Sequence, residues 1–354
     1  MDQLLRGVCF NGKIAFSFLK TTDTVNEAIR VHGLSPLTAA ALGRALTATA
    51  FMASSLKNED DALSVTIKGD GVCGGIVTTA NSRLEVRGTI DNPTAMLPPN
   101  ASGKLDVRGA VGTHGKITVV RSMGLKEPYV GTCDLVSGEL AEDFAAYYAY
   151  SEQQPTAMAL GVGISPDGTC YGAGGVVFQP MPDATDDDLK KVEAVLPKLS
   201  KVSALYEKAE AEEVLHEIIG QEEFTAQPIR YFCPCGREYF AARLTTLGKA
   251  ELEEMMETDG KIEVVCEFCG KKYVYTKDDL ADLTAPLVRE NAGNPGSAEK
   301  PEDSENAAAH AASISGDPHA AASISGAMNR TSGSCADETS GSNVAQKEED
   351  HEKT

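Results

Sequence analysis

The stretch Cys233-Pro234-Cys235-Gly236 is followed by a second cysteine motif, Cys266-Glu267-Phe268-Cys269-Gly270, with thirty residues between Cys235 and Cys266. Two close cysteine pairs at this separation are typical of zinc sites, because a tetrahedral zinc ion takes four thiolates from two short turns. The glycine after each pair lets the backbone curl so that amide groups point at sulfur. The sequence therefore predicts one zinc ion, held by Cys233, Cys235, Cys266 and Cys269.

The first cysteine pair is tighter than the Cys-x-x-Cys of most zinc knuckles, because only Pro234 separates its members. Residues this close in sequence could also form a disulfide locally, since that bond needs Cα atoms about 4.4–6.8 Å apart. Zinc ties the two pairs together and can contribute about 10–16 kcal/mol to the folding of a small module. Spacing alone leaves two interpretations open: a permanently reduced structural site, which is the commoner kind, or a site whose module unfolds on oxidation.

Length, charge and cysteine usage limit the class of protein. A chain of 354 residues suggests two domains with additional segments. The formal net charge of −20 argues against non-specific binding to nucleic acid or to an anionic membrane. No apolar run reaches the ~18 residues of a membrane span, and residues 1–6 do not resemble a signal peptide. Nine cysteines, four of them spaced as metal ligands, favour a reducing cytoplasm.

Residues 1–183 are expected to form one domain of helices and strands. Ser35 followed by Pro36 predicts the start of a long, buried, alanine-rich helix over residues 36–56. Further helices are expected over 24–31 and 139–153, and alternating apolar residues predict strands near 63–67, 117–119 and 158–164. We therefore predict an α+β fold whose N-terminal mixed α/β domain contains a largely antiparallel sheet.

Two patterns in this domain are interpreted as structural. Residues 83–88, Arg-Leu-Glu-Val-Arg-Gly, resemble residues 104–109, Lys-Leu-Asp-Val-Arg-Gly, and we expect two similar strands that end in glycine turns. The glycines 172, 174 and 175 precede a strand and lack the Lys-Ser/Thr of a phosphate-binding loop, which excludes that motif. The unpaired spacing of four further thiols predicts that they are buried as small apolar residues; they are Cys9, Cys73, Cys133 and Cys170.

Residues 184–230 are predicted to form a charged, helical linker. Thr185 and the three aspartates after it are typical of a helix start. Pro197 should kink or split the helix, and a second helix is expected over 209–219. Such segments keep their structure only while an apolar face is docked. The linker is either a rigid connector or a segment that readily unfolds. The expected apolar stripe consists of Leu189, Val192, Leu196, Leu199 and Val202.

The zinc-binding module is assigned to residues 231–287 and a disordered, acidic, low-complexity tail to 288–354. A helix over 249–256 and a strand over 262–265 are expected between the ligand pairs, and such a module is too small to fold without the metal. Its expected aromatic core is Tyr239, Phe240, Tyr273 and Tyr275. Arg237, Lys271 and Lys272 lie near the thiols in sequence and are expected to lower their pKa. The same cations would suit a zinc ribbon that binds nucleic acid.

The chain resembles the thirty-three-kilodalton heat-shock chaperone family, the redox-regulated holdases of the bacterial cytoplasm, over about residues 1–287. The resemblance rests on the two cysteine pairs together with specific stretches of the N-terminal domain. These stretches are Asp2-Gln3-Leu4-Leu5-Arg6-Gly7, the run 32–52 with Leu34-Ser35-Pro36 and Ala41-Leu42-Gly43-Arg44, Glu127-Pro128-Tyr129-Val130-Gly131, Ser151-Glu152-Gln153-Gln154-Pro155-Thr156, and Gly174-Gly175 with Gln179 and Pro182.

The resemblance implies a mechanism. The reduced, zinc-bound protein would be an inactive monomer, and oxidation would form the disulfides Cys233–Cys235 and Cys266–Cys269 and release the zinc ion. The linker would then unfold, and the protein, as a homodimer, would hold unfolding client proteins without ATP and without being an enzyme. Its location would be the cytoplasm, with neither nucleic acid nor membrane as a partner.

Two other classes compete with this interpretation. A zinc-ribbon nucleic-acid-binding protein fits the cations near the thiols but is disfavoured by the acidity of the chain. A thiol–disulfide oxidoreductase would use Cys233 and Cys235 as its redox pair.

Overall fold

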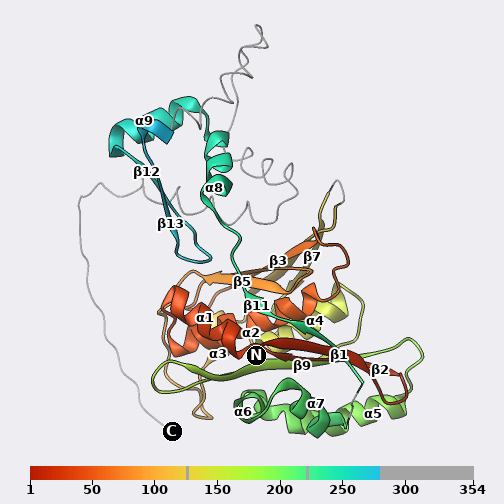
Figure 1. Cartoon of the computed structure of the whole chain (residues 1–354). Helices are drawn as coiled ribbons and strands as arrows, with labels where there is room; N and C mark the ends of the chain where they lie inside the picture. The colour runs from red at the N-terminus through yellow and green to blue at the C-terminus, as the bar shows by residue number, and fades with distance from the viewer. Residues whose placement is uncertain (125–126, 221–222, 280–354) are drawn as a thin grey trace, which may run out of the picture.

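The computed structural model describes residues 1–124, 127–220 and 223–279 (Figure 1). The predicted tail, Cys335 within it, and residues 280–287 of the predicted zinc module lie outside the described residues. Within the described ranges, no helix combines the length and the apolar character needed to cross a membrane.

Two sheets form the body of the N-terminal domain, and they confirm the predicted α+β fold. The predicted helical linker 184–230 is wrong at its end, because residues 225–231 form an edge strand of each sheet. One sheet has the strand order β10-β1-β2-β9-β8 and the other the order β11-β5-β4-β3-β6-β7. All described strand pairs in them are antiparallel except β11 with β5. The strands are β1 (Gln3–Cys9), β2 (Ile14–Lys20), β3 (Ala62–Gly69), β4 (Gly75–Asn81), β5 (Glu85–Ile90), β6 (Gly115–Ser122), β7 (Tyr129–Asp134), β8 (Ala157–Ile164), β9 (Cys170–Pro180), β10 (Thr225–Pro228) and β11 (Arg230–Tyr231).

The long helix α2 (Pro36–Ala53) packs against strands of both sheets and forms the centre of the larger core. It begins as predicted, because the Ser35 hydroxyl accepts a hydrogen bond from the Thr38 amide at 3.2 Å and Pro36 needs no amide partner. Nearly all of its residues are buried, which explains its alanine-rich composition. The other helices of the domain are α1 (Thr22–His32), α3 (Val107–Val111) and α4 (Leu140–Tyr150).

The predicted repeat of two strands that end in glycine turns is wrong in both copies, although the first copy is a strand. Residues 83–88 run into β5, and Gly88 lies inside that strand. Residues 104–109 instead lead into α3, because the Asp106 carboxylate accepts the Gly109 amide at 3.0 Å and caps a helix. The two segments therefore share a sequence pattern without sharing a conformation.

The linker covers the face of the five-stranded sheet that points away from α2 (Figure 1). Its elements are α5 (Asp186–Val195), the 3₁₀ helix η1 (Leu196–Lys201), α6 (Val202–Lys208) and α7 (Ala211–Ile219). The predicted break at Pro197 is confirmed. The predicted stripe is wrong for Leu189 and Leu196, which are 40 % and 38 % exposed. Leu189 lies off the buried face of α5, which consists of Asp188, Val192 and Val195. Leu196 is the first residue of the 3₁₀ segment that contains Pro197, where fewer residues per turn change the phase of the apolar face.

The glycines near residue 172 allow α6 to lie directly on β9. A Cβ atom at Gly172 would lie 2.2 Å from the Ser203 carbonyl oxygen, and one at Gly174 would lie 2.4 Å from the Tyr206 ring. Both partners belong to α6. These glycines, which do not form a phosphate-binding loop, therefore provide the space in which the linker helix α6 packs on the sheet.

The cysteine module, residues 231–279 of the described chain, folds around its own small core. It contains α8 (Arg237–Leu244), the 3₁₀ helix η2 (Thr245–Leu247), α9 (Lys249–Asp259) and the hairpin of β12 (Ile262–Val265) with β13 (Lys272–Tyr275). The predicted helix over 249–256 and strand over 262–265 are confirmed. The four predicted aromatic residues lie in or against this core.

Candidate metal centre

The four predicted ligands lie on two short turns. Cys233 and Cys235 lie in the segment between β11 and α8. Cys266 and Cys269 lie on the turn that joins β12 to β13, where the amide of Gly270 donates to the Cys266 carbonyl oxygen at 2.8 Å. Gly270 has φ of +67°, a left-handed conformation that glycine adopts without strain. The hairpin and the chain leaving β11 thus bring the two pairs face to face.

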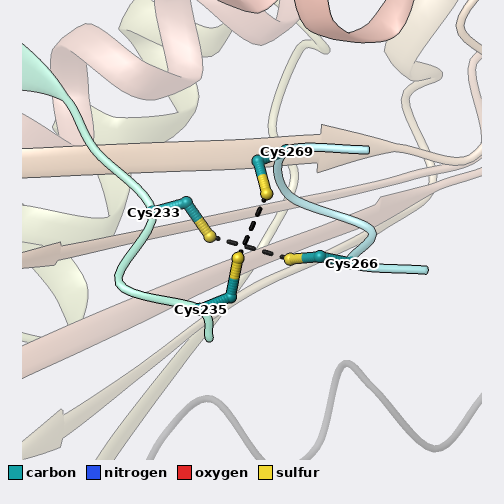
Figure 2. A group of neighbouring side chains, drawn as sticks. All are labelled: Cys233, Cys235, Cys266 and Cys269. Carbon is teal, nitrogen blue, oxygen red and sulfur yellow. Dashed lines mark hydrogen bonds between the residues drawn. The ribbon is translucent and has the colours of Figure 1, made fainter. Parts of the chain in front are cut away.

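The four sulfur atoms converge on one point (Figure 2). All lie within 4.8 Å of one another, with Cys233 and Cys266 at 3.6 Å and Cys235 and Cys269 at 3.2 Å. Four thiolates around one zinc ion at about 2.3 Å would lie roughly 3.8 Å apart. The spacing and the all-sulfur donor set therefore fit a four-thiolate metal ion of the zinc type. In the part of the chain that the structure describes, this is the only such group of potential ligands.

A cation from the N-terminal domain completes the electrostatics of the site. The Arg87 guanidinium, on β5, donates from Nη1 to the Cys233 sulfur at 3.1 Å. The hydrogen bond with Cys266 lowers the pKa of the Cys233 thiol well below its usual range, and the charge of Arg87 lowers it further. The same hydrogen bond between the two thiols raises the pKa of Cys266, and burial raises it further. Of this pair, Cys233, which accepts the hydrogen bond from Arg87, is therefore the thiol that loses its proton more readily.

Of the three cations expected from sequence proximity, Arg237 and Lys272 have other partners. Burial raises the pKa of the Cys269 thiol, whereas the backbone of Lys271 hydrogen-bonds to this thiol and lowers its pKa in part. Arg237 forms an ion pair with Asp279 at 2.6 Å and stacks on the Tyr275 ring. Lys272 pairs with Glu263 at 2.7 Å. The prediction that the side chains of Arg237 and Lys272 act on the thiols is therefore wrong, and the cation that contacts a thiol is Arg87, 146 residues before Cys233. The sequence shows Arg87 only as an arginine in an expected strand, and that pattern does not indicate that its side chain contacts Cys233.

The remaining described cysteines are not part of this site. Cys9, Cys73, Cys133 and Cys170 are buried, which confirms the prediction made for them. Burial raises the pKa of Cys9 to about 12 and those of Cys73 and Cys170 to about 11, so these thiols are protonated and unreactive near neutral pH.

Comparisons with known proteins agree on one family. The family model described as Hsp33 protein matches residues 2–276. The 33 kDa chaperonin of Bacillus subtilis (strain 168) is 42% identical over 292 residues, which cover 82% of this chain and 100% of that protein. The 33 kDa chaperonin of Staphylococcus aureus (strain JH9) is 42% identical over 291 residues, or 81% of this chain and 99% of that protein.

A solved structure gives the same result. The crystal structure of the 33 kDa chaperonin, a heat shock protein 33 homologue, from Thermotoga maritima matches with a TM-score of 0.75 and 37% identity, covering 81% of this chain and 99% of that one. The fold of this chain is therefore similar to that of a 33 kDa chaperonin, in agreement with the sequence comparisons. The chain therefore belongs to the Hsp33 protein family.

Proposed function

We propose that this protein is a redox-regulated, ATP-independent chaperone that holds unfolding proteins under oxidative stress. Membership of the Hsp33 family and the chaperonin names of the relatives support chaperone activity. The redox control is inferred from the arrangement of the cysteines and the linker.

The observation that carries the proposal is the apolar surface buried beneath the linker. Phe16, Phe18 and Phe178 of the five-stranded sheet are almost fully buried in one cluster with the linker. The linker side of this cluster consists of Val192, Val195, Leu199, Val202, Tyr206, Ala211, Val214, Leu215 and Ile218. Release of α5 to α7 would expose two complementary apolar surfaces at once. An exposed apolar patch of this kind is what an unfolding protein, with its own core residues exposed, would bind.

A short path connects this linker to the sulfurs. After α7 the chain pairs with β1 as β10 and with β5 as β11, and only Phe232 separates Tyr231 of β11 from Cys233. The strand β11 pairs through two residues, so it contributes little stability by itself. Loss of order at the cysteine module would therefore reach β11, β10 and then the linker helices.

The switch is proposed to consist of disulfide formation within each cysteine pair, Cys233 with Cys235 and Cys266 with Cys269. Each pair of thiolates gives two electrons to a two-electron oxidant such as hypochlorous acid. Two thiolates, one HOCl and one proton yield one disulfide, chloride and water. When bound, zinc supplies the cross-link between the two turns, which is worth about 10–16 kcal/mol in small modules. The four sulfurs give up that ion as they pair, and local disulfides do not replace the cross-link.

The resting and active states follow from this scheme. The reduced, zinc-bound protein is an inactive monomer, and the oxidised protein is active and dimerises through the surfaces that the linker has left. The corrected client surface is the buried set listed above, without Leu189 and Leu196, which are already exposed in the closed form. The protein acts in the cytoplasm and by binding alone, with no catalysed reaction.

The test is a light-scattering assay with a thermally aggregating client, in which reduced, zinc-loaded protein and hypochlorite-treated protein are compared at equal concentrations. Zinc release is followed in the same samples with a chromogenic chelator. We expect suppression of aggregation only by the oxidised sample, in proportion to the zinc released.

Equal suppression by both samples would contradict redox control. Turnover of disulfide substrates by catalytic amounts of protein would instead favour an oxidoreductase, and salt-dependent binding to oligonucleotides would favour a zinc ribbon that binds nucleic acid.

A further inference from the structure

Arg87 is a buried cation at the boundary between the N-terminal domain and the cysteine module. Its side chain lies on β5 and the residue is 3 % exposed. Nε donates to the Thr79 hydroxyl at 3.0 Å, and Nη1 donates to the Cys233 sulfur at 3.1 Å. Its buried Nη2 has no hydrogen-bond partner among the described residues.

The charge of this guanidinium is matched by sulfur and not by a carboxylate. None of the ion pairs recorded in the described part of the chain includes Arg87. The other large contact of the group is the Phe268 ring, whose centroid lies 4.5 Å from the guanidinium carbon. Phe268 lies between the two ligands Cys266 and Cys269. One side chain of the core domain therefore touches both ligand turns.

We propose that Arg87 is the positioning residue that makes docking of the cysteine module on the six-stranded sheet depend on the thiolate state of its sulfurs. The consequence of this docking for the linker and for chaperone activity rests on the proposed function. The docking of the module on the sheet depends only on Arg87 and the cysteines.

The physical basis is charge pairing in a buried site. Four thiolates with one divalent ion carry a net formal charge of about −2, which the guanidinium partly neutralises. Paired as disulfides, the same sulfurs carry no charge. The guanidinium would then be buried beside neutral sulfur, and an unpaired buried charge is strongly unfavourable. Separation of the module returns the guanidinium to water. The oxidised module is thus expelled as well as unfolded.

The test compares Arg87→Met and Arg87→Lys with the wild type as reduced, zinc-loaded full chains. Arg30→Met is the control, because Arg30 is 70 % exposed at its side chain and pairs with Glu27 within α1 instead of with sulfur. Hydrogen exchange is measured in peptides covering 231–235 and 266–275, and zinc stoichiometry is measured in each sample.

In Arg87→Met, we expect one zinc ion per chain to remain, with exchange in the 231–235 and 266–275 peptides about 10- to 100-fold faster than in wild type, the range expected for one charge-assisted hydrogen bond. In Arg87→Lys, the exchange rate should lie between those of wild type and Arg87→Met. Lysine keeps the positive charge but lacks the planar guanidinium, which hydrogen-bonds the Thr79 hydroxyl and the Cys233 sulfur at the same time. Arg30→Met should match wild type.

Wild-type exchange in both Arg87 variants would overturn the proposal. If Arg87→Met does not fold, judged by its circular dichroism, the lysine variant decides: faster exchange supports the proposal and unchanged exchange overturns it. The readout involves no client protein, so it gives the same answer if the chain proves not to be a redox-regulated holdase. Failure of the proposed function would appear instead in the aggregation assay on wild-type protein.

Discussion

The Tyr231 hydroxyl lies 2.6 Å from the carbonyl oxygen of Phe268, and it connects the last strand before the cysteines to the turn that holds two of them. The same hydroxyl lies 3.1 Å from the Gly88 carbonyl oxygen and 3.2 Å from His32 Nε2 in the core domain. Tyr231, where β11 meets the cysteine module, and Arg87 on β5 are thus described side chains whose polar contacts hold the module against the core domain.

Tyr231→Phe is expected to weaken docking of the module while leaving zinc binding intact. The variant loses one hydroxyl hydrogen bond, worth about 0.5–1.5 kcal/mol. Trypsin cleavage of the linker in the reduced protein should become a few-fold faster. Tyr239→Phe is a suitable control, because its ring lies within the module. Cleavage at the wild-type rate in Tyr231→Phe would show that the hydroxyl does not hold the turn.

Cys266→Ser is expected to abolish tight zinc binding and to unfold the cysteine module. Loss of a ligand should cost more than the roughly 10- to 100-fold in affinity that loss of an outer-shell partner costs. Zinc content by mass spectrometry and the near-ultraviolet circular dichroism of the module's tyrosines provide the measurement. Cys133→Ser, at a buried thiol outside the cluster, should keep one zinc ion per chain. Undiminished zinc affinity in Cys266→Ser would exclude the four-sulfur site.

Gly172→Ala is expected to lift α6 from β9 in the reduced protein. The added Cβ would lie 2.2 Å from the Ser203 carbonyl oxygen and 2.8 Å from the Glu207 amide nitrogen, and backbone atoms of a packed helix move only at a cost of about 1–3 kcal/mol. The variant should bind a hydrophobic dye and suppress aggregation without prior zinc loss.

The control for this change is Gly163→Ala, at the residue paired with Gly172 in the sheet. Its Cβ would meet the far end of the Tyr171 ring, a partly exposed side chain that can rotate away. If Gly172→Ala behaved like this control, α6 would not depend on the glycine seat.

Glu85 should make the closed form sensitive to acid. Burial raises the pKa of this carboxyl, but hydrogen bonds from Arg230, Asn81 and Arg83 outweigh it and lower the pKa to about 2. A lowered pKa in the folded state means that the carboxylate stabilises the fold above its unfolded pKa near 4.5, and that this contribution is lost as the pH falls toward 2.

Arg230 belongs to β11, so the affected contact joins the linker to the core. In Glu85→Gln, urea unfolding at pH 7 should show a stability lower by about 1–3 kcal/mol, with the difference from wild type shrinking between pH 4.5 and pH 2. A difference that stays constant with pH would mean that the charge of Glu85 is not what matters.

Local signals predicted the parts of this structure that depend on local chemistry. Ser35 and Pro36 specified the start of α2, and Pro197 specified the break in the linker. The cysteine spacing predicted a four-sulfur cluster, because two turns with soft ligands have few other uses.

Features that depend on distant contacts were missed or misassigned. Strand β2 is buried along most of its length, and the buried residues of β1 are Leu4, Leu5 and Cys9, so neither strand shows the alternation that identifies a half-exposed strand. Asp106 turned a strand-like pattern into a helix by capping it. Arg87 reaches Cys233 across 146 residues, and no local pattern specifies that contact.

We propose that oxidation of the four cysteines releases the linker from the five-stranded sheet. Hydrogen exchange of peptides covering α6 and α7 should be measured on the full chain before and after hypochlorite treatment. We expect slow exchange in the reduced, zinc-loaded protein and exchange close to that of an unfolded chain once zinc has left. Continued slow exchange in α6 and α7 while the oxidised protein suppresses aggregation would contradict it.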